Sequence, residues 1–427
     1  MIVKKLNLIA SIIVLVGLIG VSCSYHNDDN PNEYPDVKPL PEPDPEPQPD
    51  INETYLKAIY TSNCYMVKPQ KTIRIPIVKA YAMWSLYQDW LSDSIRMSDA
   101  PQAVLLWQDH PRLIETIDLV AGDIHENDQI VVKTNDHVGN AVVAIKMGGK
   151  IRWSWHLWVT RYDPNASLVA YGKTYSWDNN GDLQKDYVFM DRNLGATLDK
   201  PMIDYTHEDS LAVCGLLYQW GRKDPFPGDH DFRYTNETDY NYFESKPLYN
   251  LEGHHLIENG ADGIQSIKTD VDTSITGLEK SFINPMTVYL GTDDYSNWYC
   301  SKQPVEIVRC DTLWSDSNGK TPFDPCPEGW RIPSDKNDLF VWNNLDKVTE
   351  DNSALGVFPY AGFRYRAGGG CLKNSGFSAC LWTGTPPTVG NARYLSIYIV
   401  PRSKLPAIKQ EVGSRSDGRS VRCVKCE

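Results

Sequence analysis

The chain has 427 residues, and the part that follows position 50 is longer than one hydrophobic core usually serves, so we expect two domains. The formal net charge is −13 with no concentrated basic run, which argues against a phosphate-binding surface and a nucleic-acid partner. The composition includes 13 Trp and 24 Tyr among short apolar runs separated by turn residues, and it predicts a β-rich fold.

Residues 1–22 have the pattern of a secretory signal peptide. Two lysines precede an apolar run over residues 6–21, and small residues lead to Cys23. The segment resembles a bacterial lipobox, in which the cysteine carries a diacylglycerol thioether, although Gly20 stands where leucine is usual. The alternatives are an uncleaved membrane anchor and plain secretion with Cys23 unmodified. A run of about sixteen residues is short for a span, which needs about 20, so we expect lipidation of Cys23.

Residues 23–50 are expected to form a lipidated stalk. From residue 27 onward, proline alternates with acidic residues, which prevents a core from forming and favours an extended polyproline II chain of roughly 70 Å. The acidic pair Asp28 and Asp29 is similar to the export signals of surface lipoproteins in Bacteroidota. We therefore expect a protein anchored by lipid in the outer membrane and exposed at the cell surface.

Residues 51–165 are predicted to form a β-sandwich. The clearest signal is a hairpin over residues 141–160, where apolar residues alternate on both sides of Gly148 and Gly149, a pair suited to the positive φ angles of a tight turn. Further short apolar runs lie at residues 73–78, 104–107 and 130–132. Runs of this length favour strands over long helices.

Three tryptophans in the second half of this hairpin have two interpretations. Trp153, Trp155 and Trp158 could form an aromatic platform for a sugar, but two of the rings share the apolar face, which favours core packing. His156 lies among them without a partner nearby in the sequence, and we interpret it as a structural or exposed residue.

Residues 166–427 contain a series of short motifs that are more specific than composition. They are MDRNLGA, LYQWG, DPCPEGWRIP, YAGFR, LWTGTP and GRSVRCV, which begin at positions 190, 217, 324, 360, 381 and 418. In this order they resemble the Fibrobacter succinogenes major paralogous domain, a module of surface lipoproteins and fimbrillin-like proteins of gut Bacteroidota. The resemblance implies an α+β fold like that of C-type lectins and formylglycine-generating enzymes.

The segment 229–320 departs from the compact form of this family. It is long and polar, and insertions in such folds usually lie on an exposed loop face, where binding residues often occur. Its aromatic residues Tyr240, Tyr242, Tyr295 and Trp298 are therefore candidate contacts for a glycan or a protein ligand. The alternative is that the insertion merely decorates the domain and that these rings pack it onto the scaffold.

The ten cysteines indicate an oxidising compartment. Without Cys23, nine remain, so at least one thiol has no partner within the chain. Cys300 with Cys310, and Cys371 with Cys380, lie close enough in sequence to close hairpins, but the sequence does not fix their connectivity.

The family resemblance adds a third candidate disulfide. It places Cys326 and Cys423 at structural positions, and a bridge between them would hold the last strand beside the DPCPEGWRIP segment. The pair Cys423 and Cys426 forms a C-x-x-C motif, but no second pair or nearby histidine completes a zinc site, so we expect no metal and no cofactor.

The sequence favours binding over catalysis. No nucleophile elbow, zinc-protease, phosphate-loop or dinucleotide motif occurs, and the fold analogy with formylglycine-generating enzymes does not by itself imply their activity. We expect a surface lipoprotein that acts as a fimbrial tip or accessory subunit or as an adhesin. The alternative is a glycan-capture lipoprotein of an outer-membrane polysaccharide uptake system. The two would differ in their partners, which are fimbrial subunits in one case and a soluble polysaccharide in the other.

Overall fold

The structure is a computed structural model in which residues 51–427 form one compact unit. It describes residues 53–96, 98–165, 170–171, 187–199, 206–230, 245–258, 260, 263–267, 277–291, 297–299, 311–314, 319–334, 358–384, 391–399 and 406–426. The signal segment, Cys23 and the stalk lie outside the described residues. None of the helices in the described part has the length and apolar character needed to span a membrane.

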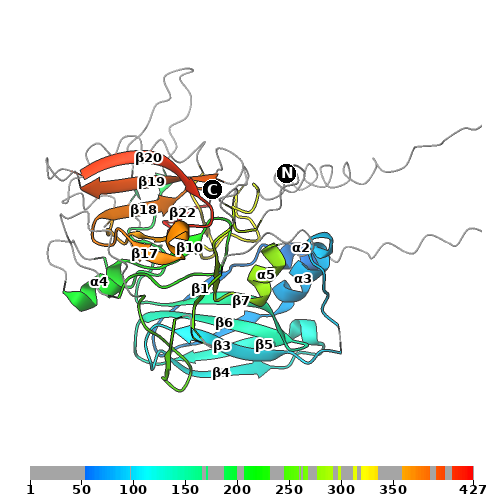
Figure 1. Ribbon diagram of the computed structural model, residues 1–427. Coiled ribbons are helices and arrows are strands. Elements are labelled where there is room, and N and C mark those ends of the chain that lie inside the picture. Colours follow the sequence, from blue (N-terminus) through cyan, green and yellow to red (C-terminus); the bar gives the residue numbers. More distant parts are fainter. Residues whose placement is uncertain are drawn as a thin grey trace, which may run out of the picture. The chain divides into compact units, whose positions relative to one another are not determined.

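A six-stranded sheet combines strands from distant parts of the chain (Figure 1). Its order is β1 (Cys64–Val67), β7 (Lys150–Val159), β6 (Gly139–Met147), β3 (Gln102–Gln108), β11 (Leu248–Tyr249) and β12 (His255–Leu256). β1 runs parallel to β7, whereas the other neighbouring strands are antiparallel. The predicted hairpin is confirmed, because β6 and β7 are joined by Gly148 and Gly149 with φ angles of 57° and 78°.

A three-stranded sheet and several short helices complete residues 53–165. The sheet has the order β2 (Thr72–Pro76), β5 (Gln129–Thr134) and β4 (Ile114–Val120). The helical segments are α2 (Glu53–Ala58), α3 (Val78–Leu86), η1 (Gln88–Trp90) and η2 (His125–Asn127). The α3 helix follows β2 directly and is buried from Lys79 to Trp84, so its sequence has no polar face that would have revealed a helix. Trp84 fixes it to β7 by donating a hydrogen bond of 2.7 Å to the Arg152 carbonyl.

The larger sheet of the second half has seven strands. Its order is β17 (Cys371–Lys373), β16 (Phe363–Tyr365), β21 (Gly418–Ser420), β18 (Ser378–Trp382), β19 (Asn391–Ile399) and β20 (Pro406–Ser414), and β10 (Leu217–Gln219) also pairs with β21. Shorter pairs are β8 (Ala170–Tyr171) with β9 (Tyr187–Val188), β13 (Gln265–Ile267) with β14 (Thr287–Tyr289), and β15 (Trp330–Arg331) with β22 (Val424–Lys425). The helices are α4 (His207–Val213), α5 (Gly277–Ile283) and η5 (Arg366–Gly368). The β-rich character is thus confirmed.

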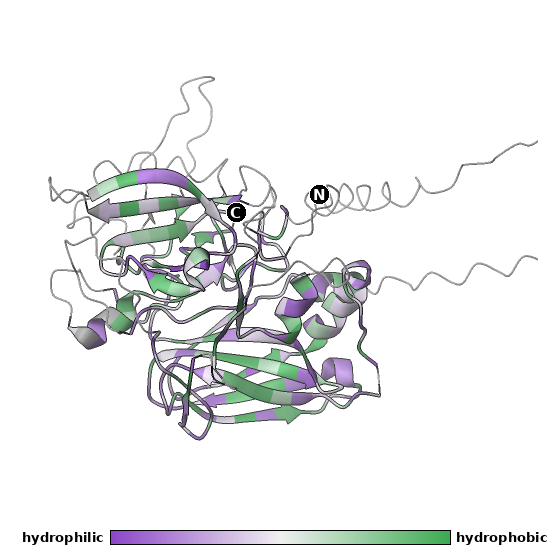
Figure 2. Cartoon of the chain, viewed as in Figure 1, coloured by the Kyte–Doolittle hydropathy of each residue, from purple (hydrophilic) through white to green (hydrophobic). Residues whose placement is uncertain are grey.

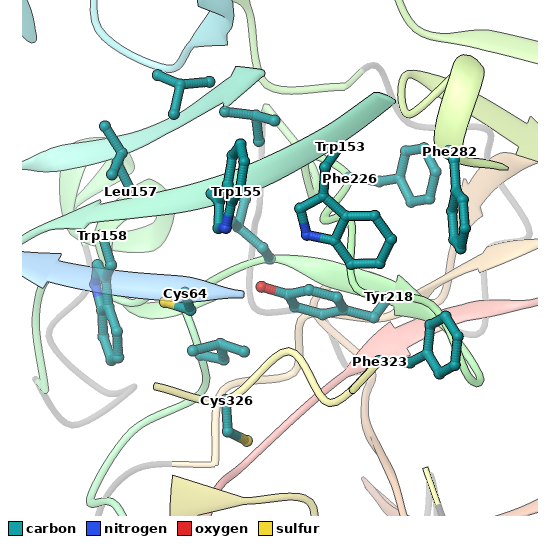
Figure 3. Close-up of a cluster of buried hydrophobic side chains, with 14 of the residues drawn as sticks. Cys64, Trp153, Trp155, Leu157, Trp158, Tyr218, Phe226, Phe282, Phe323 and Cys326 are labelled. Carbon is teal, nitrogen blue, oxygen red and sulfur yellow. The ribbon is translucent and has the colours of Figure 1, made fainter. Parts of the chain in front are cut away.

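One hydrophobic core extends across both halves of the described chain. Almost every residue of β6 and β7 is buried, and the tryptophans of β7 lie in the same cluster as Tyr218 and Phe323 (Figure 3). Trp153, Trp155 and Trp158 are each at most 1% exposed, which confirms core packing. The hydropathy colouring in Figure 2 places hydrophobic residues throughout these strands. A domain boundary near residue 165 stays a prediction.

The described parts of the segment 229–320 contribute to this core rather than decorate a loop face. Its strands β11 and β12 extend the six-stranded sheet beyond β3. Its helix α5 brings Phe282 to 4.7 Å from the ring of Trp153, and Glu279 accepts hydrogen bonds from the main chain and hydroxyl of Ser92. The expectation of an exposed insertion is therefore wrong for these residues, because they cover apolar surface of the first half.

The shared core makes a prediction about fragments. Residues 51–165 alone would expose the side of β7 that residues 218–226 and Phe282 cover. We therefore expect residues 51–427 to unfold in one cooperative transition and the fragment 51–165 to lack one, as measured by circular dichroism during thermal unfolding. The fragment 166–427 is the matched comparison. Independent cooperative melting of both fragments would instead establish two domains.

Candidate binding cleft

An open cleft of about 310 Å³ lies beside the ends of β1 and β7. One wall is formed by β1 and the residue that follows it, and another by the segment 160–165 after β7. Pro327, Glu328 and Trp330 close the third side. The parallel pairing explains this position, because parallel strands bring their carboxyl ends, and the loops that follow, to the same edge of a sheet.

The third wall is attached to β1 by side chains at the start of that strand. The amide of Asn63 donates to the carbonyls of Pro322 and Asp324 at 2.8 and 2.9 Å, and the Ser62 hydroxyl lies 3.2 Å from the Cys326 carbonyl. A main-chain bridge pairs Cys64 with the residue after Cys326. These buried contacts join segments that are more than 250 residues apart in sequence.

Asp324 and a disulfide hold the same wall from behind. The carboxylate of Asp324 accepts hydrogen bonds of 2.8 Å from the main chain of Cys326 and Ile332 and from Lys320. Cys326 is bonded to Cys423, the pair implied by the family resemblance. Each carboxylate oxygen is therefore satisfied, and the wall is fixed without any contribution from a ligand.

The lining of the cleft combines an aromatic ring with carboxylates and an amide. Tyr65 is half-buried, and burial together with the nearby Glu328 carboxylate raises the pKa of its hydroxyl to about 12, so it stays a hydrogen-bond donor at neutral pH. The side chains of Asp163, Asn165 and Glu328 are exposed at the rim, and Lys68 adds a cation. Flat apolar surface beside hydrogen-bonding groups is the chemistry that binds sugar rings or a polar peptide segment.

Tyr162 contributes to the cleft but its ring is already engaged. The Arg192 guanidinium lies 3.9 Å from its centroid, and the Trp158 ring lies 5.8 Å away on the strand side. The main-chain N–H of Tyr162 donates to the Thr160 hydroxyl. Tyr162 thus anchors the loop after β7, and Tyr65 is the aromatic side chain left to contact a ligand.

The aromatic candidates of the insertion do not form this site. Trp298 is only 2% exposed, and its indole N–H donates to the Trp220 carbonyl at 2.9 Å, so its predicted role as an exposed contact is wrong. It is buried because it lies against the scaffold tryptophan of the LYQWG motif. Tyr240, Tyr242 and Tyr295 lie outside the described residues.

Two of the candidate cysteines remain unbridged. Cys371 begins β17 and Cys380 lies in β18, and the strands β16 and β21 separate β17 from β18 in the sheet order. The two cysteines therefore do not close a hairpin. The predicted disulfide between them is wrong, and both are thiols. Cys300 and Cys310 lie outside the described residues, as does Cys23.

His156 belongs to a buried polar network that joins the two halves. Its Nε2 lies 3.0 Å from Asn140 Oδ1, and its Nδ1 lies 3.3 Å from the hydroxyl of Tyr218. The amide nitrogen of Asn140 donates to Asp109 and to the Gly195 carbonyl, both at 2.9 Å, so the amide oxygen must be an acceptor. This assigns the imidazole proton to Nε2, and the Tyr218 hydroxyl then donates to Nδ1.

The network has the residue types of a catalytic cluster but serves a structural role. His156 is 1% exposed and Tyr218 is fully buried, so a substrate has no access to either group. Burial lowers the pKa of His156 to about 3, against a smaller opposing effect of Asp109, and the ring is neutral at physiological pH. Of the two interpretations of His156, the structural one is therefore correct.

No protein family, curated protein or solved structure matches this chain. The sequence alone does not predict the cleft, because Tyr65 and Glu328 lie 263 positions apart and neither belongs to a periodic pattern. The only local sequence pattern among the cleft residues is the Pro-rich DPCPEGWRIP motif, which contains Glu328. Its tryptophan and disulfide are structural, whereas its exposed glutamate is a cleft residue.

The neutral His156 predicts a specific pH dependence of stability. The imidazole titrates near 6.5 in the unfolded chain and near 3 in the folded chain, so the unfolded state binds more protons between these values. The free energy of unfolding should fall as the pH drops below about 6.5, by up to about 1.4 kcal/mol per pH unit from this group. Urea unfolding of the wild type and of His156→Gln between pH 7 and 5 measures the difference in slope.

The matched control is His254→Gln, since the side chain of His254 is exposed. This control should keep the pH slope of the wild type. An identical slope in His156→Gln and the wild type would contradict the assignment of a neutral buried imidazole.

Proposed function

We propose that this chain is a surface-exposed lipoprotein that acts as an adhesin-like binding protein, as a tip or accessory subunit of a fimbrium. The observation that carries the proposal is the open cleft, whose wall is fixed by Asp324 and the Cys326–Cys423 disulfide before any ligand binds. A preformed site binds without the entropic cost of ordering its own loops. The signal peptide, Cys23 and the acidic stalk of the sequence support display at the outer membrane.

We further propose that residues 166–427 adopt a C-type-lectin-like arrangement. The support comes from the positions of the motif residues, since Arg419, Trp382 and Cys423 are buried within the second half. The β22 strand at the end of the chain pairs with β15 of the DPCPEGWRIP segment, as expected for a fold in which the last strand closes the domain. In this proposal the motifs build the scaffold, and exposed residues outside the buried set determine the ligand.

A second function, glycan capture for a polysaccharide importer, is favoured by the cleft chemistry. The ring of Tyr65 and the side chains of Asp163, Asn165 and Glu328 line the same cleft and offer stacking and hydrogen bonding to a sugar. Both functions use the same contacts. They differ in whether the glycan is fixed to another surface or is free in solution.

Lipid anchoring is tested by radiolabelled palmitate incorporation. Because a thioether can form only at the cysteine that follows the signal, Cys23→Ala should abolish labelling and release the protein from the outer membrane. Protease added to intact cells should degrade the wild-type head. Persistent labelling of the variant, or a head that survives protease on intact cells, would exclude the display proposal.

The cleft is tested by binding assays on the intact chain with glycan arrays and whole cells. Replacing Tyr65 with Ala removes the stacking surface, and Glu328→Ala removes an exposed hydrogen-bond acceptor, so each should weaken binding at least about tenfold. Tyr60→Ala is the control, because Tyr60 is 49% exposed but does not line the cleft. Unchanged binding in both cleft variants would show that the ligand binds outside the cleft. An intact chain that binds neither glycans nor cells would exclude both proposed functions.

A further inference from the structure

The cleft runs beside the outer edge of β1, the last strand on one side of the six-stranded sheet (Figure 1). Every residue of β1 lines the cleft, as does Lys68 directly after it. Within the described residues, the only main-chain bridge on this outer edge joins Cys64 to Pro327. The edge therefore stays open after its first residue. An open strand edge is a template on which another polypeptide can pair.

The ladder between β1 and β7 shows which main-chain groups of β1 face the cleft. The Asn63 carbonyl accepts a hydrogen bond of 2.9 Å from the His156 N–H. Further along, the Val67 carbonyl accepts from the Thr160 N–H at the same distance. In a parallel ladder, alternate residues direct both their N–H and their carbonyl to the same neighbour. Positions 63, 65 and 67 therefore bond to β7, and the N–H and carbonyl of Met66 point outward. Neither group has a partner in the part of the chain that the structure describes.

The opposite wall shows how an added strand would lie. The segment at Pro327 runs parallel to β1 beside Cys64, as one residue of such a strand does. The chain then turns at Glu328 and Gly329, where φ is 77°, and continues as β15, which pairs with β22 instead. A ligand with a main chain of its own can continue the abandoned line past Met66, because its N–H and carbonyl groups recur at the spacing of a strand.

The side chains around this edge select the charge of the ligand. The cleft is lined by two exposed carboxylates, those of Asp163 and Glu328, and by one cation, Lys68. The half-buried ring of Tyr65 adds apolar surface. A Lys or Arg side chain of the ligand can cover this ring with its apolar stem while its charged end approaches a carboxylate. An acidic ligand would instead bring like charges together.

We propose that the ligand of the cleft is an extended, basic polypeptide segment that adds to β1 as a strand. The inference rests on the proposed function of the cleft as the binding site of an adhesin, and it makes the ligand a protein. The N–H and carbonyl of Met66 form main-chain hydrogen bonds with the segment, which provide affinity. Tyr65 and the rim carboxylates provide the preference for basic side chains.

Peptide binding is measured by selecting random short peptides displayed on phage against the intact chain. The enriched peptides should be rich in Lys or Arg, and synthetic copies should bind in titration calorimetry. Exchanging one peptide amide at a time for an ester then removes a single N–H. The ester opposite the Met66 carbonyl should weaken binding about fivefold. The two adjacent esters should have no effect, because neighbouring N–H groups of a strand point to opposite sides.

Variants of the chain test the same bond from the other side. Met66→Pro removes the outward N–H and no bond to β7, so it should weaken the selected peptides at least about fivefold. Arg74→Pro is the matched control, because Arg74 is exposed on the edge strand β2 and by the same alternation directs its N–H away from β5. Glu328→Gln keeps the shape of the side chain and should weaken basic peptides but not uncharged ones. Circular dichroism verifies that each variant remains folded.

Failure of this inference is distinct from failure of the proposed function. Strand addition is contradicted if no peptide is enriched, or if the peptides bind Met66→Pro as tightly as the wild type. If the intact chain then binds a glycan and Tyr65→Ala abolishes that binding, the cleft keeps its proposed function with a sugar as its ligand. An intact chain that binds no peptide, no glycan and no cell surface would exclude the function of the cleft as well.

Discussion

The strand β7 must bury Ser154 and His156 while both of its faces are covered, and the remainder of the structure supplies hydrogen-bond partners for these two side chains. Ser154 donates to Asp224 at 2.6 Å, and His156 is held between Asn140 and Tyr218. An unpaired buried polar group costs about 1–3 kcal/mol, a large fraction of the net stability of a folded chain. Because two of these partners come 62 and 70 residues later in the sequence, β7 reaches its native environment only when the second half folds against it.

Buried arginines stabilise the second half in a related manner. Arg419 lies 3.7 Å from the ring of Tyr394, Arg415 lies 4.4 Å from that of Trp220, and Arg422 lies 3.9 Å from that of Phe358. A guanidinium is weakly hydrated and can stack on an aromatic face, so it tolerates burial better than an ammonium does. The motifs that contain Arg419, Arg422 and Trp220 are accordingly scaffold, and the cleft obtains its exposed groups from other positions.

The parallel pairing of β1 with β7 decides where the cleft lies. It brings the ends of two strands to one sheet edge and leaves room there for the DPCPEGWRIP segment, which Asn63 and the Cys326–Cys423 disulfide fix in place.

The sequence by itself determined the features that depend on neighbouring residues. Gly148 and Gly149 with alternating apolar flanks specify the β6–β7 hairpin, because turn geometry and side-chain alternation are local properties. The runs at 104–107 and 130–132 lie within β3 and β5 for the same reason. The disulfide between Cys326 and Cys423 was predicted only from the resemblance of several motifs, taken together, to a known family.

Only the tertiary structure decided the features that depend on distant pairing. The α3 helix has no polar face to reveal it, since its residues from Lys79 to Trp84 are all buried. The polar sequence around Trp298 predicts an exposed ring, but the side chain is buried and its indole N–H donates to the Trp220 carbonyl. Tyr65 and Glu328 meet at one cleft because a parallel strand pair and a disulfide bring them together, and sequence periodicity contains no information about contacts of that separation.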